Sequence, residues 1–356
     1  MTNVNNIEKL NTVKQRVWFN TWFSAISITL QEIKKTFPNI TLIGTNKNED
    51  CVYQKDCDEF YVEPTGDVFK YIDFAVEFCK EHKIDVFIPK AYAEAISYNI
   101  DRFNEIGVKV LVEDAEVIKT FDSKAFAYET LAYMGYDKIP EYTIVNSADE
   151  FMEAYKKYTA QREVVCLKYD KDEGAASFRV VHDQFLTAKY LSGESNNIIT
   201  SANMMTVLRD MEDKGVFKPI MVMPKLAGPE ASVDCYYSEH KGLVAIPRYK
   251  LGNRIKKVEL THDLIDDCIW LQDNFGFKGV YNAQYRWDKN GKPKLLEVNT
   301  RMSGGIHLTS LCGYSIPLQA LADILGVGDA LAQQWEDVRN CRMTQYETPF
   351  LLSIDE

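Results

Sequence analysis

The sequence predicts an α/β protein whose first third forms a parallel sheet covered by helices on both faces. Strand-like and helix-like segments alternate over residues 1–119, and repeated β-α-β alternation is typical of such a sheet. Beyond residue 120, hairpin-like strands mix with amphipathic helices, which indicates a different architecture. The 356 residues exceed what one compact core accommodates, so we expect two or three subdomains.

In the first third, we predict strands where short apolar runs are bounded by turn residues and helices where apolar residues recur at helical spacing. The predicted strands are Arg16–Phe19, Ile40–Ile43, Asp85–Pro89 and Val108–Val112. The predicted helices are Ala25–Lys35, Val68–His82 and Ala91–Glu105. Gly44, Thr45 and Asn46 follow the second strand and predict a turn.

The later elements begin with a helix that opens at Asp122-Ser123-Lys124, with Asp or Ser as its cap, and runs to Met134. Further helices are predicted at Asp149–Tyr158, Ala202–Lys214, 263–274 and Pro317–Leu325. Strands are predicted at Val164–Lys168, Phe178–His182, 220–226, 231–237 and 242–250. A hairpin has the arms Val280–Trp287 and Lys294–Asn299, joined by Asp-Lys-Asn-Gly. No element is predicted for the tail after residue 326.

Composition indicates a soluble globular protein of the cytoplasm. The apolar fraction of 46% and the charged fraction of 26% are ordinary, and no apolar run approaches the length of a membrane span. The net charge of −11 argues against nucleic acid or an anionic membrane as partner. The 8 cysteines form no C-x-x-C pair, and Cys79 and Cys166 are expected to be buried free thiols.

The segment Leu295–Gly305, which reads LLEVNTRMSGG, is the most informative part of the chain. Glu297, Asn299 and Arg301 alternate, so on a strand they project from one face. Burying this set without a ligand is costly, whereas carboxylate and amide oxygens suit Mg²⁺ and a guanidinium suits phosphate. Gln284, on the opposing hairpin arm, adds a third oxygen donor. The alternative is an edge strand with exposed polar residues and ordinary cross-strand pairs.

Two lysines are candidates for phosphate binding. Lys168 ends a buried-type strand and leads into the loop Asp170–Ser177, an arrangement that can hold phosphate beneath a backbone lid. Lys124 opposes the dipole at the start of its helix, and an anionic ligand would remove that conflict. The alternatives are a surface lysine before a solvated turn and an ordinary exposed lysine.

Two further segments complete the candidate site. The apolar strand Met221–Leu226, followed by Ala-Gly-Pro-Glu230, could wall a purine, or it is a core strand that ends in a turn. Arg248, Lys250 and Arg254 suit a carboxylate or a transferred phosphate, or they form a solvated basic strand. His262 and His307 have no triad-like context and receive no role.

The order of these signals resembles the ATP-grasp superfamily over roughly residues 85–325, with the pieces DVFIP, AEAI, GVKVL, FDSKAF and EVNTRMSGG. The chain is most similar in style to the ATP-binding halves of carbamoyl-phosphate synthase and to small carboxylate–amine ligases. This resemblance implies a Rossmann-like pre-ATP-grasp domain followed by a two-subdomain α+β ATP-grasp fold. The implied domains are 1–119, then 120–225 with the lysines and the phosphate loop, then 226–356 with the metal site and the tail.

The resemblance also implies roles for individual residues. Contacts to the phosphates of ATP would come from Lys124, Lys168, Gly174, Ala175 and Ser177. Backbone groups of Pro224 and Leu226 would contact adenine, and Glu230 would lie near the ribose. Mg²⁺, or Mn²⁺ in its place, would be held by Gln284, Glu297 and Asn299. Arg301 would stabilise the acylphosphate, and the acceptor side would contain Arg248, Ser303, Gly304 and Gly305.

The implied activity is that of an ATP-dependent ligase that joins a small carboxylate to an amine, or to a related nucleophile, through an acylphosphate. The sequence departs from the superfamily pattern in two places: the 170–177 loop has few glycines, and Pro224 stands where many members carry an acidic residue. These departures favour an alternative, a nucleotide-binding sensor or scaffold that has lost ligation. Phosphotransfer or ATP hydrolysis without ligation is a third hypothesis. A homodimer is expected by analogy only.

Overall fold

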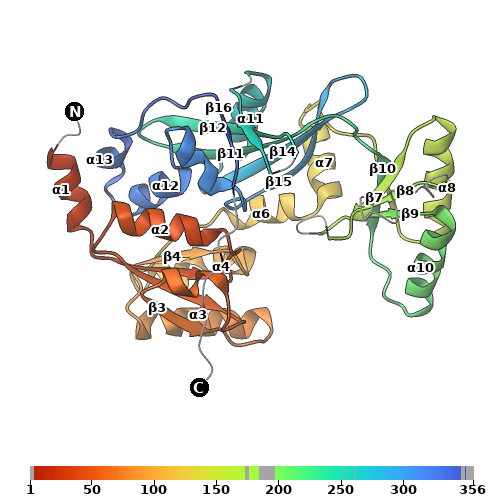
Figure 1. The fold of residues 1–356 in the computed structure, drawn as a ribbon. Coiled ribbons are helices and arrows are strands. Elements are labelled where there is room, and N and C mark those ends of the chain that lie inside the picture. Colours follow the sequence, from red (N-terminus) through yellow and green to blue (C-terminus); the bar gives the residue numbers. More distant parts are fainter. Residues whose placement is uncertain are drawn as a thin grey trace. The chain divides into compact units, whose positions relative to one another are not determined.

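The computed structural model describes residues 4–172, 176–183, 197–252, 254–260, 262–345 and 349. The chain forms two compact units, of which the first contains Met1–Lys119, Ala231–Gln284 and Val298–Glu356. The second contains Thr120–Glu230 and Tyr285–Glu297. The predicted α/β class is confirmed (Figure 1). The division into three domains at 119/120 and 225/226 stays a prediction.

The first sheet has 5 strands in the order β3-β2-β1-β4-β5, and every pair is parallel. Its strands are β1 (Arg16–Asn20), β2 (Thr41–Asn46), β3 (Glu59–Val62), β4 (Val86–Pro89) and β5 (Lys109–Val110). Alternate residues of β1 face opposite ways: Val17 and Phe19 pack towards α2 (Ile26–Thr36), and Trp18 packs towards α3 (Val68–Glu81). The two helices therefore cover opposite faces (Figure 1), as the sequence predicts.

Several details of this region differ from prediction. Gly44, Thr45 and Asn46 belong to β2 and form no turn; a side chain at Gly44 would lie 2.5 Å from Cys57 Sγ, so glycine serves packing here. The predicted helix Ala91–Glu105 is two short helices, α4 (Ala93–Tyr98) and α5 (Ile100–Asn104), interrupted at Asn99. The sequence pattern missed α1 (Val4–Thr12), η1 (Val52–Asp56), β3 and α6 (Ala115–Asp122).

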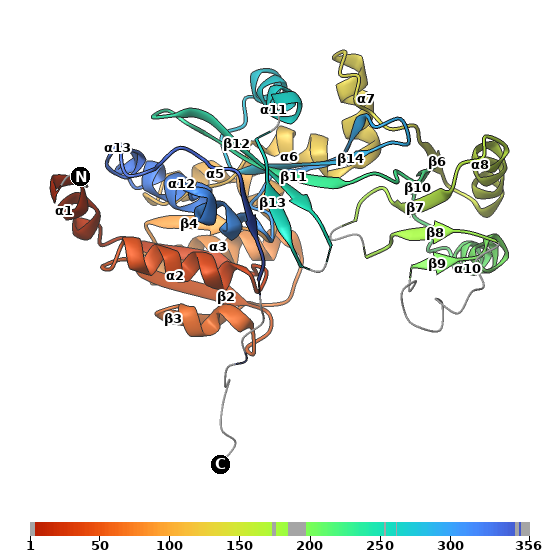
Figure 2. The same cartoon turned by 45° about the horizontal axis from the view of Figure 1, so that its top comes forward.

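The second sheet lies in the second unit, in the order β6-β10-β7-β8-β9. Its strands are β6 (Thr143–Val145), β7 (Val165–Tyr169), β8 (Arg179–Val181), β9 (Ile198–Ile199) and β10 (Ile220–Pro224). Helices α8 (Ala148–Ala160) and α10 (Ser201–Asp213) cover one face and bury Val165 and Leu167 of β7 (Figure 2). The opposite face carries Cys166 and packs against Tyr128 of α7 (Lys124–Tyr133).

The third sheet has 6 strands in the order β15-β14-β11-β12-β13-β16. These strands are β11 (Glu230–Ser238), β12 (Gly242–Lys250), β13 (Lys256–Val258), β14 (Tyr281–Trp287), β15 (Pro293–Asn299) and β16 (Cys341–Met343). The Tyr281 hydroxyl donates to the Cys268 carbonyl at 3.0 Å and fastens α11 (His262–Phe275) to the sheet. β16 comes from the tail for which no element was predicted.

The remaining helices complete the core of the first unit. They are η2 (Ile306–Cys312), α12 (Ile316–Ile324) and α13 (Gly328–Ala332). One apolar cluster joins Leu30 of α2, Ile246 of β12, Ile306 of η2 and Leu321 of α12. The segment 302–307 is therefore held against α2 by packing.

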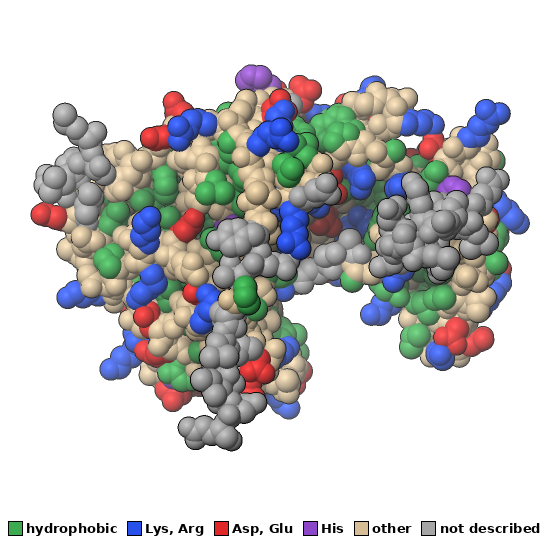
Figure 3. Space-filling view, viewed as in Figure 1, with side chains coloured by type: hydrophobic (Ala, Val, Ile, Leu, Met, Phe, Trp, Pro, Cys, Tyr) green, Lys and Arg blue, Asp and Glu red, His purple; other side chains and the backbone are tan. Residues whose placement is uncertain are grey.

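The exposed side chains are mixed in type, as the ordinary apolar and charged fractions of the sequence predict. Charged side chains of both signs are interspersed over the face seen in Figure 3, with apolar side chains in small groups. No helix among those the structure describes is long and apolar enough to cross a membrane. All 8 cysteines are free thiols, and Cys79 and Cys166 are buried as predicted.

Candidate functional site

The first part of the candidate site is the start of α7. Ser123 is the cap: its Oγ accepts the amide hydrogen of Phe126 at 3.1 Å. The carboxylate of Asp170, just after β7, accepts from the Ala125 amide at 2.7 Å and from the Ser123 hydroxyl at 2.6 Å. A carboxylate is favourable at a helix N-terminus. Asp170 therefore fixes where the first helical residue, Lys124, points.

Lys124 is buried, with 5% of its surface exposed, so the alternative of an ordinary exposed lysine is wrong. Its Nζ donates to the backbone carbonyls of Asp170 at 3.3 Å and Asp172 at 3.0 Å. The same nitrogen lies 3.6 Å from Oε2 of Glu297. A buried ammonium needs such partners because desolvation penalises the charge.

Lys168 adds a second cation to this group. It lies at the end of β7, opposite Met221 in the register with β10 and on the face that carries Cys166. The pKa of Lys168 is lowered to about 8, because burial and, to a smaller extent, the nearby Lys124 outweigh the opposing effect of Glu297. We call Lys124, Lys168 and Glu297 the lysine cluster. Two desolvated cations close to each other form a site with affinity for phosphate oxygens.

The predicted phosphate loop is described only at its ends. Gly174 and Ala175 lie outside the described residues. The Ser177 hydroxyl accepts from the Tyr169 amide at 2.8 Å, and the Ser177 amide donates to the Asp172 carboxylate at 2.9 Å. Asp172 thus bonds both to Lys124, through its carbonyl, and to Ser177, through its side chain. The phosphate contact predicted for Ser177 stays a prediction.

The predicted purine wall is an apolar strand that ends in a tight turn. Pro224 ends β10, and Leu226 is 9% exposed in the cluster with Met223. Gly228 is required there because a side chain would lie 2.5 Å from Cβ of Trp287. Arg286, which the sequence analysis did not single out, lies 3.7 Å from the Glu230 carboxylate. The adenine and ribose contacts of Pro224, Leu226 and Glu230 stay predictions.

A separate group of candidate residues is buried in the first unit, around Arg248. Nε and Nη2 of Arg248 each lie 2.6 Å from Oδ2 of Asp234, and the two residues are 4% and 0% exposed. Nη2 also donates to the Ser303 hydroxyl at 3.0 Å. Ser303 in turn donates to the other oxygen of Asp234 at 2.7 Å. For Arg248, the alternative of a solvated basic strand is wrong.

Asn282 of β14 closes this network. Its Nδ2 donates to Asp234 at 2.8 Å and to the Ser232 hydroxyl at 2.9 Å. We call Ser232, Asp234, Arg248, Asn282 and Ser303 the arginine cluster. Both partners of its ion pair also hydrogen-bond to neighbouring side chains, which offsets the cost of burying the two charges.

More cations lie along the same face of the sheet. Lys250 and Lys256 are opposite each other in the pairing of β12 with β13. Burial lowers the pKa of Lys256, and Arg248 and Lys250 lower it further. Lys250 and Arg254 are exposed. The predicted basic group is therefore split into a buried arginine and two surface residues, and the half-buried Lys256 lies beside it without having been predicted.

The predicted acceptor glycines differ in their surroundings. A side chain at Gly305 would lie 2.5 Å from Nη1 of Arg248, whereas no described atom lies within 4 Å of one at Gly304. Gly305 and Ser303 thus lie beside the buried arginine. The guanidinium of Arg301 lies 4.9 Å from the centre of the Phe23 ring and donates to the Met302 carbonyl. The catalytic roles predicted for Arg301 and Arg248 stay predictions.

The predicted metal ligands are Gln284 on β14 and Glu297 and Asn299 on β15. The Glu297 side chain is 24% exposed, and the Gln284 amide nitrogen donates to Asn282 at 3.3 Å. Carboxylate and amide oxygens are donors that Mg²⁺ accepts, so the residue types fit. Over the described ranges, no three His, Cys, Asp or Glu side chains gather into a metal cluster. The assignment of these three ligands stays a prediction.

Sequence reasoning missed Asp234, Asn282, Asp170 and Arg286. The available signal for Asp234 was a lone carboxylate inside the apolar strand Glu230–Ser238, paired through the hairpin register with the strand of Arg248. Asp170 was visible as the first acidic residue after Lys168. Neither signal was decisive, because an aspartate in a strand or in a turn has many ordinary causes.

Comparison with known proteins gives one family match and a set of structures with a similar fold. Residues 216–349 match the family described as ATP-grasp in the biosynthetic pathway with Ter operon. No protein of curated function matches the chain. A solved structure of N5-carboxyaminoimidazole synthetase from Staphylococcus aureus, complexed with ADP, is similar with a TM-score of 0.65 at 12% identity, covering 94% of this chain and 83% of that one.

Two other solved structures show the same likeness. L-amino acid ligase from Bacillus licheniformis is similar with a TM-score of 0.61 at 11% identity, over 87% of this chain and 74% of that one. Pyruvate carboxylase T882A from Rhizobium etli is similar with a TM-score of 0.63 at 15% identity, over 92% of this chain. This chain spans only 30% of that carboxylase.

The chain therefore has the ATP-grasp fold preceded by an N-terminal α/β domain, as the resemblance implies. The resemblance to the ATP-grasp superfamily is supported over residues 216–349 by the family model and, for the fold, by the similar solved structures. The residues matched by the family model include the arginine cluster and the segment Glu297–Gly305.

Proposed function

We propose that this chain is an ATP- and Mg²⁺-dependent ligase that joins a small-molecule carboxylate to an amine through an acylphosphate. The observation that carries the proposal is the lysine cluster, in which two desolvated cations lie beside the Glu297 carboxylate. The ATP-grasp fold and its likeness to an ADP-complexed synthetase and to an L-amino acid ligase support it.

In the first step, Lys124 and Lys168 bind the phosphates and offset the charge that spreads over the transferring phosphoryl group. A carboxylate oxygen of the acid substrate forms a bond to the γ-phosphorus, and the bond from that phosphorus to the bridging oxygen breaks. ADP leaves with the electron pair. No side chain of the protein acts as nucleophile, so the protein contributes positioning and electrostatics.

In the second step, the amine nitrogen forms a bond to the acyl carbon and inorganic phosphate leaves. The nitrogen then loses one proton to water or phosphate. Arg248 and Arg301 stabilise the negative charge of the acylphosphate. The buried ion pair with Asp234 keeps Arg248 in a single orientation, which reduces the reorganisation that the reaction requires.

Gln284, Glu297 and Asn299 would hold Mg²⁺, or Mn²⁺ in its place. When bound, the metal would neutralise charge on the phosphates of the nucleotide. The proposal also places the chain in a reducing compartment, because its 8 cysteines are free thiols.

The decisive experiment is a screen of acid and amine pairs with purified protein, ATP and Mg²⁺, in which ADP release and the condensed product are both measured by mass. We expect one pair to yield ADP, phosphate and a product heavier than either substrate. Glu297→Gln serves as the inactive comparison. ATP binding without turnover for every pair, unchanged by Glu297→Ala, would support the sensor instead. ADP without a condensed product would indicate hydrolysis or phosphotransfer.

A further inference from the structure

Two cysteines that are far apart in the sequence lie side by side in the first unit. Sγ of Cys312, at the end of η2, lies 3.2 Å from Sγ of Cys341, the first residue of β16, and the two residues are 29 positions apart. Both are free thiols; Cys312 is 1% exposed, whereas Cys341 is half-buried. The sulfurs of a disulfide are about 2.0 Å apart, so a further approach of roughly 1 Å would form one.

The backbones beside the two cysteines are also in contact. The Arg339 amide donates to the Cys312 carbonyl at 3.0 Å. A side chain at Gly313 would lie 3.2 Å from the carbonyl oxygen of Asp337. Because main-chain contacts hold the two segments this close, forming the bond calls for rotation of the two side chains more than for movement of the backbone.

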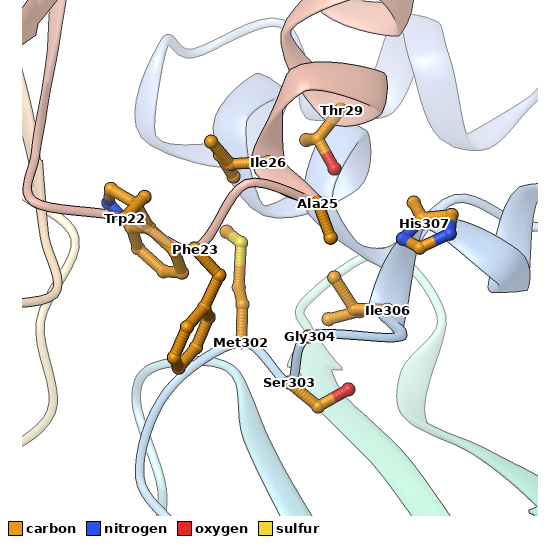
Figure 4. Close-up of a pocket in the computed structure, with 10 residues that line it drawn as sticks. All are labelled: Trp22, Phe23, Ala25, Ile26, Thr29, Met302, Ser303, Gly304, Ile306 and His307. Carbon is orange, nitrogen blue, oxygen red and sulfur yellow. The ribbon is translucent and has the colours of Figure 1, made fainter. Parts of the chain in front are cut away.

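The two cysteines belong to elements that are held in place to different degrees. Ile306 and Cys312 of η2 are both part of the large apolar cluster of the first unit. Figure 4 shows Ile306 and Ile26, at the start of α2, lining the same small pocket. β16 has three residues and lies at the border of the third sheet, paired with β13. A disulfide would therefore fasten a short edge strand to a well-packed helix.

The sheet pairing places this pair near the arginine cluster. Cys341 is opposite Val258 of β13, and Val258 is opposite Arg248 of β12. Residues in one such row of an antiparallel sheet point to the same face. The two cysteines and Arg248 therefore lie on one side of the third sheet.

The two thiols differ in how readily they react. The pKa of the Cys312 thiol is raised to about 12, because burial and the neighbouring Cys341 outweigh the opposing effect of Arg248. Cys312 therefore stays protonated near neutral pH and is shielded from solvent. Thiol exchange requires a thiolate and access to it, so the more exposed Cys341 reacts first.

We infer that Cys312 and Cys341 form a modification site, a dithiol that a low-molecular-weight disulfide such as oxidised glutathione converts to an internal disulfide. This inference does not depend on the proposed ligase function. In a reducing compartment the two thiols stay free, and they form the bond when the proportion of disulfide rises. The oxidised form fastens β16 to η2 and so keeps the border of the third sheet covered.

The reaction takes place in two thiol–disulfide exchanges. The Cys341 thiol loses its proton, and its sulfur forms a bond to one sulfur of the oxidised glutathione. The S–S bond of that molecule breaks, and the glutathione that leaves takes up a proton. Cys312 then loses its proton and bonds to the Cys341 sulfur, and the second glutathione leaves and is protonated. Two protein thiols are oxidised, and one glutathione disulfide is reduced to two thiols.

The test treats the full, reduced chain with oxidised glutathione, blocks the remaining thiols with iodoacetamide and digests the protein with trypsin. Cleavage after Arg301, Arg339 and Arg342 places the two cysteines in separate peptides, 302–339 and 340–342. We expect mass spectra to show these two peptides joined in the absence of a reductant and separated after treatment with dithiothreitol.

Variants distinguish this pair from the other thiols. In Cys312→Ser, Cys341 has lost its partner and should keep a stable glutathione adduct. Cys79→Ala, which removes a buried thiol of α3, is the matched control and should give the joined peptides as wild type does. Hydrogen exchange at the amides of 341–343 should slow about tenfold in oxidised wild type, because the bond opposes local detachment of the strand. It should not slow in Cys312→Ser treated in the same way.

Three results on the wild-type chain would overturn the inference, and none requires a variant to fold. A stable glutathione adduct on Cys341, with Cys312 still reduced, would mean that the buried thiol does not reach its neighbour. Peptides joined through other cysteines, with 302–339 and 340–342 left separate, would mean that a different pair is oxidised. Eight alkylated thiols after prolonged treatment would mean that Cys341 is closed to small disulfides.

Discussion

The ammonium nitrogen of Lys124 lies 3.6 Å from Oε2 of Glu297 and 3.0 Å from the carbonyl oxygen of Asp172. One buried cation therefore connects the first residue of α7, the loop after β7 and a carboxylate on β15. Because the Glu297 side chain keeps 24% of its surface exposed, it can reach both this lysine and a bound ligand.

We expect Glu297→Gln to lower ADP release about a hundredfold or more, because an amide carries no charge to offset a metal or to orient Lys124. The thermal unfolding temperature should change little, since the shape of the side chain is retained. Glu129→Gln, at an exposed position of α7, is the matched control. A rate of ADP release equal to that of wild type in Glu297→Gln would show that Glu297 has no role in the mechanism.

ATP binding should weaken as the pH rises through about 8, because burial lowers the pKa of Lys168 to about 8 and the neutral amine attracts phosphate poorly. Calorimetric titration with ATP should show the dissociation constant rising roughly tenfold between pH 7 and pH 9. Lys168→Arg, whose side chain stays charged, should bind with little pH dependence over this range. A wild-type affinity that is flat with pH would contradict the assignment.

The same lowered pKa predicts the direction of a stability change. The unfolded chain has its lysine pKa near 10.4, so between about pH 8 and pH 10 the unfolded state binds more protons at this position. The contribution of Lys168 to the free energy of unfolding therefore rises with pH in that window. Urea unfolding of wild type and Lys168→Met at pH 7 and pH 9.5 measures this. The free energy of unfolding of wild type, relative to that of Lys168→Met, should be higher at pH 9.5 than at pH 7.

Asp234→Ala should destabilise the first unit by about 3–5 kcal/mol, because it leaves the buried guanidinium of Arg248 without its counter-charge. Urea unfolding measures the change. The comparison is Asp210→Ala, which breaks the exposed pair of Asp210 with Lys214 and should cost about 1 kcal/mol or less. Similar losses of unfolding free energy in the two variants would mean that the buried ion pair contributes no more to stability than the exposed one.

Gly305→Ala should lower the unfolding temperature, since its Cβ would lie 2.5 Å from Nη1 of an arginine that the Asp234 ion pair holds in place. Overpacking of this kind costs about 1–3 kcal/mol. Gly304→Ala is the adjacent comparison, and it should be tolerated because no described atom lies within 4 Å of its Cβ. Calorimetry on the two variants decides between them, and an equal drop in both would contradict the packing argument.

The elements that the sequence predicts well are those whose pattern is local. The strand over 242–250 has the bounds Gly242–Lys250 in the structure, and Ser123 caps α7 within the predicted opening Asp122-Ser123-Lys124. The turn predicted at Gly44 is wrong. Glycine is needed there because a side chain would clash with Cys57, which only the fold brings close. β3 was missed because a short, half-buried edge strand carries little hydrophobic periodicity.

The candidate residues also include some that the sequence predicts and some that only the fold reveals. Lys124, Lys168 and Glu297 were found from residue type and order, and the structure brings Lys124 to Glu297. The burial of Arg248 by Asp234 and Asn282 was not predictable, because the three residues lie on three different strands and only the sheet pairing aligns them.

The tail strand β16 affects how readily copies of this chain associate through the border of the third sheet. Its three residues pair with Lys256–Val258 of β13 and so occupy what would otherwise be the open border of the third sheet. A chain shortened before Cys341 would present the unpaired amides and carbonyls of β13 to any extended segment in solution. Such borders recruit strands from neighbouring molecules, so the shortened chain should self-associate more readily than the full chain as the concentration rises.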